Sequence, residues 1–251
     1  MTRKDFLIEN EKNKDWKKTL RPQKDGKEIL KPYPLMTMRE KYMYNNIYKI
    51  GYLDIETSGL TANFDFMVSW CMYVRDVRTG KTELRGDKIN PKDFEVARKG
   101  TKKDGKWTPD ADLVDKRILE SLLKAISDID CLIGHWFIGK HRHDIPFVRS
   151  RIAINKISGF PKHKMVRYGD TQKLGSLIHR LSSNGLAMIG DAYGVSTKKT
   201  QIKSKHWKNA CMFGNKESVD YIYHHNIKDV ILTYKIHKCM EEYVPIPAIY
   251  A

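Results

Sequence analysis

The chain has 251 residues, of which 41% are hydrophobic and 30% are charged. This length and composition are typical of a globular protein that buries a core without disulfides, as one large domain or one domain with an extension. No apolar run is long enough to predict a membrane span, and the polar N-terminal residues do not match a signal peptide. The four cysteines are scattered without a C-x-x-C pair, which favours reduced thiols and a cytoplasmic location.

Charge is the most informative property of the composition. Lys and Arg total 46 and Asp and Glu total 30, so the formal net charge is +16. A basic excess of this size favours a polyanionic partner through counterion release. An anionic membrane surface would require a strongly amphipathic basic helix, and the sequence shows none. The composition therefore favours nucleic acid as the partner.

Residues 1–46 are predicted to form a basic N-terminal extension, followed by one domain over residues 47–251. The extension is rich in charged residues, and three prolines interrupt regular structure within it. A short helix around residues 36–44 is compatible with its pattern. Its basic residues are candidates for contacts with a nucleic acid backbone, although solvated surface charge is the commoner explanation.

The residues after the extension predict a mixed sheet flanked by helices. Three strands in succession favour an antiparallel meander, and the polar, Lys-rich stretch after them is expected to be a loop. The order of three strands, helix, strand, helix, strand and then helices predicts an α/β fold. The expected elements are strands at 50–55, 66–77, 82–85, 131–136 and 166–170, a loop at 86–110, and helices at 112–128, 171–181, 185–193, 218–242 and from Asp144 onward.

Two acids, Asp54 and Glu56, lie in the first predicted strand directly before a turn. Because side chains alternate along a strand, both carboxylates point to one face, while Leu53 and Ile55 point to a face that helices cover. Adjacent carboxylates repel each other and are costly to keep ionised unless cations neutralise them. The pair therefore indicates a divalent metal site; the alternative is two solvated acids at a strand end.

Two further acids occupy unusual places. Asp144 follows an apolar strand and begins a predicted helix, where an N-cap is the structural alternative to a functional role. Asp229 lies in the middle of the last predicted helix, although Asp is a poor helix former. An acid at that position is either on the wet face or part of a site.

Taken in order, three stretches resemble the motifs of the DEDD superfamily of 3′→5′ exonucleases, a group that includes proofreading exonucleases and has a ribonuclease H-like fold. A fourth stretch is similar to the segment that leads from a strand into a helix before the third motif. The resemblance spans about residues 47–243. The motif stretches are Asp54–Leu60, then Ile133–His135 with Asp144–Val148, then His225–Val230, and the connecting stretch is Gly169–Leu174.

The resemblance implies a metal-dependent 3′→5′ exonuclease that acts on single-stranded nucleic acid, with DNA favoured over RNA. It implies that Asp54, Glu56, Asp144 and Asp229 hold two Mg²⁺ or Mn²⁺ ions, hard cations suited to oxygen ligands. In that chemistry one ion activates a water and the other stabilises the leaving 3′ oxygen. A neutral histidine beside the water takes its proton.

The chain departs from the family pattern in two places. Trp136 stands where Asn usually follows Gly-His, and a longer His-rich spacer precedes Asp144. Relatives carry either His five residues before the last Asp or Tyr four residues before it, and this chain has His224 and His225 at those places. Because residues four apart share a helix face, we expect His225 to be the base, with His224 as the alternative.

A rival metal site would use Cys131, His135, His141 and His143 as zinc ligands. Their spacing matches no closed Cys/His zinc pattern, so this hypothesis is the weaker one.

A basic cluster covers residues 198–208 and includes Lys198, Lys199 and Lys203, with Trp207 among them. A solvated face is the simplest interpretation. Its place in the chain, where the family approaches the substrate strand, favours contacts with a nucleic acid backbone.

Two other functions are compatible with the motifs: an exoribonuclease of the same superfamily, and a non-catalytic nucleic-acid-binding protein with this fold. The complete set of acids argues against the second. No motif separates DNA from RNA, because discrimination depends on contacts to the 2′-OH. The choice of single or double strands, the oligomeric state and any replication or repair partner are likewise not encoded in a motif.

Overall fold

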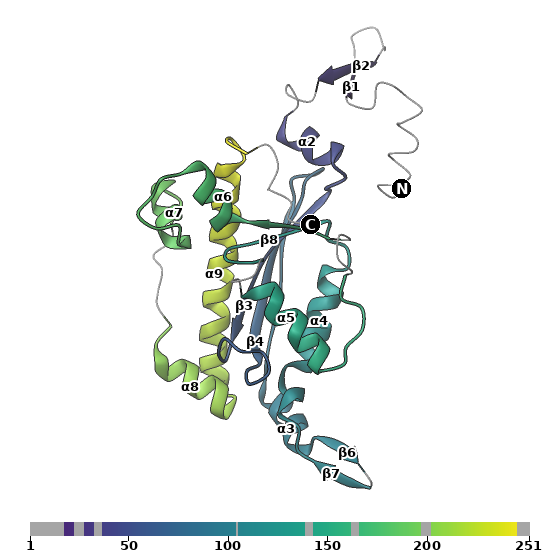
Figure 1. Cartoon of the computed structure of the whole chain (residues 1–251), viewed down its shortest axis with the longest axis vertical. Helices are drawn as coiled ribbons and strands as arrows, with labels where there is room; N and C mark the ends of the chain where they lie inside the picture. The colour runs from purple at the N-terminus through teal and green to yellow at the C-terminus, as the bar shows by residue number, and fades with distance from the viewer. Residues whose placement is uncertain are drawn as a thin grey trace.

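A five-stranded mixed sheet forms the centre of the computed structural model (Figure 1). The structure describes residues 18–22, 28–32, 37–103, 105–138, 143–161, 166–196 and 202–244. The strand order is β5-β4-β3-β8-β9; β3 pairs antiparallel with β4 and parallel with β8, so the predicted meander and the mixed sheet are confirmed. The strands are β3 (Lys49–Thr57), β4 (Met67–Asp76), β5 (Thr82–Lys88), β8 (Cys131–Gly134) and β9 (Arg167–Asp170).

Helices cover both faces of this sheet. The long helix α9 lies along one face, and α4 and α5 lie against the other (Figure 1). Within the described ranges, no helix is both long and apolar enough to cross a bilayer. The helices are α2 (Met38–Tyr44), α3 (Pro91–Lys99), α4 (Lys116–Ile126), α5 (Asp144–Ile154), α6 (Thr171–Ile178), α7 (Leu186–Ala192), α8 (Ser204–Phe213) and α9 (Lys216–Met240).

Strand β3 is the central strand, and its side chains alternate as predicted. Leu53 and Ile55 are buried in the main core cluster together with Ile118 of α4. Tyr52 points to the opposite face, where its ring meets that of Tyr234 of α9 at a centroid distance of 5.2 Å. Because the pleat has a period of two residues, Asp54 and Glu56 lie on this α9 face.

The prediction of a loop at 86–110 is wrong, because this segment forms a helix and a hairpin. Asn90 and Asp93 form a capping box around the start of α3, and Pro91 sits in its first turn, where its missing N–H costs nothing. The strands β6 (Thr101–Lys103) and β7 (Lys106–Thr108) then pair as a short antiparallel hairpin. The high Lys content of the stretch concealed these local signals.

Within the predicted N-terminal extension, α2 begins with a capping box between Thr37 and Glu40, close to the expected helix. Ahead of it, β1 (Lys18–Pro22) and β2 (Glu28–Pro32) pair antiparallel. Helix α2 also contributes Tyr42, which is fully buried. The division of the chain at residue 46 stays a prediction.

A buried polar cluster, which we call the Tyr52–His237 network, joins α2 and the sheet to the C-terminal half of α9. The hydroxyl of Tyr52 lies 2.8 Å from Nδ1 of His237. The hydroxyl of Tyr42 donates to Oε1 of Glu241 at 3.0 Å, and Arg75 of β4 donates to the same oxygen at 2.6 Å. Each of these polar groups therefore has a hydrogen-bond partner in the interior.

Candidate active site

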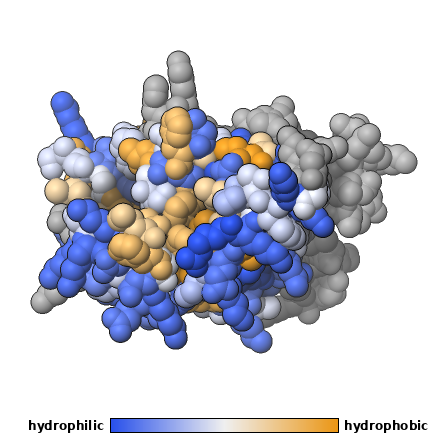
Figure 2. Space-filling view, turned by 90° about the horizontal axis from the view of Figure 1, so that it is seen from below, coloured by the Kyte–Doolittle hydropathy of each residue, from blue (hydrophilic) through white to orange (hydrophobic). Residues whose placement is uncertain are grey.

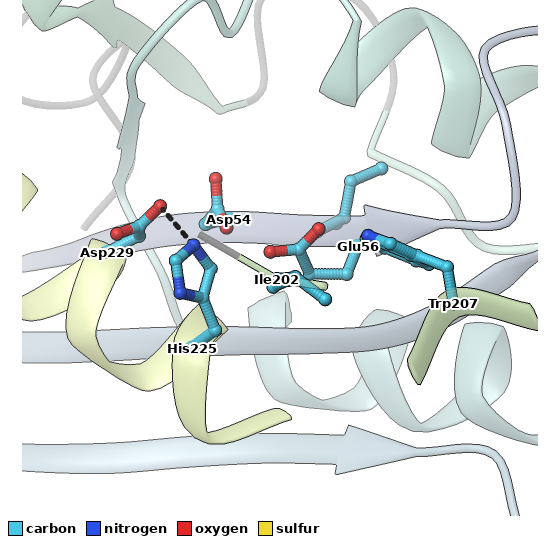
Figure 3. Close-up of a pocket in the computed structure, with 7 residues that line it drawn as sticks. Asp54, Glu56, Ile202, Trp207, His225 and Asp229 are labelled. Carbon is cyan, nitrogen blue, oxygen red and sulfur yellow. Dashed lines mark ion pairs between the residues drawn. The ribbon is translucent and has the colours of Figure 1, made fainter. Parts of the chain in front are cut away.

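A pocket of about 470 Å³ opens where β3 passes the N-terminal half of α9. Asp54 and Glu56 rise from the same side of β3 into it (Figure 3). His225 and Asp229 enter from α9, so three of the four predicted metal ligands line one pocket with the predicted base. The remaining lining residues are Ile55, Ile202 and Trp207.

The two candidate histidines of α9 have different surroundings. His225 is only 8% exposed, and its Nε2 lies 3.6 Å from Oδ2 of Asp229, one turn further along the helix. His224 is exposed, and its Nδ1 donates to the backbone carbonyl of Asp220 at 2.6 Å. Of the two, His225 lines the pocket and His224 does not.

Asp144, the first residue of α5, lies deeper than the other acids and is only 6% exposed. Its Oδ2 is buried and has no hydrogen-bond partner in the described part of the chain. Burial raises the pKa of Asp144 well above its usual value, and repulsion from Glu56 and Asp170 adds to this. A carboxylate that is buried, crowded by acids and not hydrogen-bonded at one oxygen needs a cation to remain ionised.

Asp170 positions residues 136–138, which precede Asp144 in the chain, a role that the sequence did not reveal. Its carboxylate caps α6 by accepting the backbone N–H groups of Gln172 and Lys173. It also accepts the backbone N–H of Phe137 at 2.9 Å, and the carbonyl of Phe137 in turn accepts the N–H of Ile145 in α5 at 3.2 Å. Asp followed by a helix is a recognisable N-cap signal, but its second set of partners is distant in sequence.

Trp136 adopts a left-handed backbone conformation with φ at 60°. Asn is enriched in that region and a bulky residue such as Trp is strained there, which gives a physical reason for the Asn usual at this place in the family that the sequence resembles. Oδ1 of Asp170 accepts the backbone N–H of Trp136 at 3.3 Å, and the carbonyl of Trp136 accepts the N–H of His143 at 3.2 Å. These bonds hold the turn at Trp136 against Asp170 and against His143, the residue before Asp144.

The rival zinc ligands are dispersed in the described structure. Cys131 is fully buried in a core cluster, and Nδ1 of His135 lies 2.9 Å from the hydroxyl of Thr171. Nε2 of His143 lies 3.1 Å from the hydroxyl of Thr57, whereas His141 lies outside the described residues. Within the described ranges, no group of three or more His, Cys, Asp or Glu side chains is arranged to hold a metal ion.

The carboxylates of the pocket nevertheless fit a hard divalent cation by their chemistry. Asp54, Glu56 and Asp229 offer only oxygen donors, which Mg²⁺ and Mn²⁺ prefer. The buried oxygen of Asp144 and its repulsion by Glu56 mark a place where positive charge would be stabilising.

Helix α8 adds groups that the sequence did not assign to the site. Trp207 of α8 and Ile202 just before it line the pocket (Figure 3). Lys203 is exposed at the N-cap of α8, and the predicted backbone-binding residues Lys198 and Lys199 lie outside the described residues. An aromatic residue inside a Lys-rich run was the available signal for Trp207.

The sheet order and the helices on both faces define an α/β fold of the ribonuclease H-like class, as predicted. Among solved structures, the chain is similar to the family B DNA polymerase from the hyperthermophilic archaeon Pyrobaculum calidifontis. The identity is 12% and the TM-score 0.54, over 79% of this chain and 25% of the polymerase, so this chain spans about a quarter of its length. It is also similar to a full-length 3′-exonuclease, with 13% identity and a TM-score of 0.50, over 81% of this chain and 85% of that one. No protein-family model and no curated protein matches the sequence.

Proposed function

We propose that this chain is a metal-dependent 3′→5′ exonuclease that hydrolyses phosphodiester bonds of single-stranded nucleic acid, with DNA preferred over RNA. The observation that carries the proposal is the convergence of Asp54, Glu56 and Asp229 with His225 in one pocket of an exonuclease-like fold. Three acids and a histidine from distant parts of the chain suit phosphodiester hydrolysis, whereas a binding protein has no need of them.

Asp54, Glu56, Asp144 and Asp229 are the proposed ligands of two Mg²⁺ or Mn²⁺ ions. When bound, such ions supply an activated water and charge stabilisation at the scissile phosphate. The protein's part is to present carboxylates on rigid elements: β3 carries two of them, and the helices α5 and α9 carry one each.

His225 is the proposed general base. A neutral imidazole accepts a proton at one ring nitrogen, which is the role of a general base near neutral pH. Once protonated, its Nε2 is stabilised by Oδ2 of Asp229 at 3.6 Å. His224 lacks this position because its imidazole bonds to the helix backbone on the exposed side.

Substrate contacts are proposed for α8 and the segment before it. Trp207 presents an aromatic ring in the pocket, where a terminal base would stack. Lys198, Lys199 and Lys203 are proposed to contact backbone phosphates, which position a strand without selecting its sequence.

A degradation assay on matched single-stranded DNA and RNA oligonucleotides tests the function. With a label at the 5′ end and Mg²⁺ or Mn²⁺ present, we expect a ladder shortened from the 3′ end that a chelator stops. The Asp54→Asn variant, purified identically, should produce none, which excludes a contaminating nuclease. A ladder on RNA alone would make the chain an exoribonuclease. Binding without cleavage, or cleavage that survives thorough chelation, would reject the proposal.

A further inference from the structure

The hairpin of β6 and β7 takes no part in the candidate active site. It projects beyond α3 at the lower end of the molecule (Figure 1). Trp107 on β7 is 54% exposed, although a large aromatic side chain usually contributes to stability through burial. The exposed indole is therefore accessible to a ligand or partner, and the charges around it decide which kind it suits.

Positive charge surrounds this indole. Residues 98–108 contain five Lys and Arg residues and one acid, a net charge of +4. Nζ of Lys99 lies 4.6 Å from the ring centroid of Trp107, and the hairpin register places Lys102 opposite Trp107.

The hairpin is fixed to α3 by its backbone. Gly100, which joins the two, has φ at 68°, and a Cβ there would lie 1.7 Å from the carbonyl oxygen of Thr108, so only glycine fits. The N–H of Gly100 donates to Val96 at 2.8 Å, and the N–H of Asp110 donates to Ala97 at 2.9 Å. Trp107 is therefore presented on a defined element.

Packing connects this end to the active site. The ring of Phe94 in α3 meets Phe66, just before β4, at a centroid distance of 6.0 Å. Phe94 also closely approaches Gly214, where α8 ends, because a Cβ on Gly214 would lie 2.7 Å from its ring. Helix α8 carries Trp207 in the pocket, so α8 and α3 form a continuous series of packed elements between the pocket and the hairpin. Seen from below, this end presents an apolar centre surrounded by hydrophilic side chains (Figure 2).

We propose that the β6–β7 hairpin is a second nucleic-acid contact, which holds the single strand outside the active site. A base stacks on Trp107, while Lys99 and Lys102 contact phosphates. The proposal rests on the proposed function, because it assumes a nucleic acid substrate. An aromatic platform flanked by lysines suits a polyanion with stackable bases better than it suits a protein surface.

Binding by strands of two lengths tests this contact. The full chain carrying Asp54→Asn serves as the parent protein, so that cleavage does not interfere. Binding is measured by fluorescence anisotropy on single strands of about 4 and about 20 nucleotides. The two lengths differ in reach, because one binding groove covers roughly 4–16 nucleotides. Trp107→Ala should weaken binding of the long strand at least about fivefold and leave the short strand unchanged. Leu177→Ala, at an exposed apolar residue of α6, is the matched control and should change neither.

Salt dependence adds a second readout. Lys102→Gln should reduce the slope of log affinity against log salt by about 0.7, the value for one phosphate contact on a single strand. Lys124→Gln, at an exposed residue of α4, should leave the slope unchanged. If the parent binds both strands and Trp107→Ala binds them equally well, the hairpin proposal fails while the proposed function stands. If Trp107→Ala in addition changes the oligomeric mass of the protein, Trp107 belongs to a protein contact. If the parent binds no nucleic acid, the proposed function fails as well.

Discussion

The two ends of the interface between β3 and α9 have opposite characters. At one end, Tyr52 and His237 belong to a network in which buried polar groups bond to one another. At the other end, two and four residues further along the strand, Asp54 and Glu56 face His225 and Asp229 across an open pocket. Strand and helix continue through both ends, so side-chain chemistry alone makes the difference.

This contrast separates stability from function within one pair of elements. A satisfied buried network keeps a unique arrangement, and removing one partner leaves another unpaired. A crowded set of carboxylates lowers stability, because each ionised acid raises the free energy of the others. Such a set is therefore typical of a functional site. Substitutions at the two ends should therefore have opposite signatures.

The largest expected effect comes from Asp54→Asn. Loss of a proposed metal ligand should reduce nuclease turnover by about 10³-fold, as for a single group that stabilises transition-state charge. Thermal stability without metal should stay the same or rise, because a repelling carboxylate has been removed.

Tyr52→Phe is the matched control at the other end of the interface. It should lower the free energy of unfolding by about 1–3 kcal/mol, because Nδ1 of His237 loses the Tyr52 hydroxyl as its hydrogen-bond partner. Turnover of the folded variant should stay near that of the parent. If Asp54→Asn unfolds the protein instead, Asp54 is structural and the contrast between the two ends is lost.

The next effect concerns the two histidines of α9. His225→Ala should reduce turnover by roughly 10²-fold and remove the acidic limb of the pH–rate profile, because the proton acceptor is gone. His224→Ala should change little, because its side chain faces away from the pocket. Turnover rates of both variants, measured across pH at saturating substrate, show which histidine is the base. The reverse result would move the base to His224, and two unaffected variants would exclude a histidine base.

At the Tyr52–His237 end, stability should depend on pH through His237. Burial lowers the pKa of His237 to about 4, against about 6.5 in the unfolded chain. The unfolded chain binds more protons between these values, so this contribution is complete above pH 6.5 and is lost as the pH falls toward 4. The free energy of unfolding should fall by about 2 kcal/mol between pH 7 and pH 5 on this account. Denaturant titrations of His237→Gln should show a correspondingly flatter profile; an equally steep one would place the dependence elsewhere.

The smallest effect tests the strain beside the pocket. Trp136→Asn should raise the free energy of unfolding by about 1 kcal/mol, because Asn tolerates the left-handed backbone at a lower cost than Trp. Chemical denaturation at neutral pH measures this change. Ile138→Val, in the same loop, is a control without backbone strain and should not stabilise. A destabilised Trp136→Asn would show that indole contacts outweigh the backbone cost.

Local periodicity in the amino-acid sequence determined much of this protein. The two-residue alternation of β3 set Asp54 and Glu56 on one face with Leu53 and Ile55 on the other. The helical repeat aligned His225 with Asp229, and the order of the elements predicted the mixed sheet. These features depend on near neighbours in the chain, so the sequence contains them. The metal-ligand and base assignments remain proposals.

Tertiary structure decided what depends on residues far apart in the chain. Asp170 clamps the loop at Phe137, and Trp207 reaches the pocket of β3, because packing brings distant backbone and side chains together. The Lys-rich stretch before α4 has the composition of a loop, yet a capping box and a glycine at positive φ build α3 and its hairpin there. Composition averages over such a stretch, whereas hydrogen bonds and steric fit act at single positions. For that reason the exposure of Trp107 and the burial of Asp144 are properties of the folded chain alone.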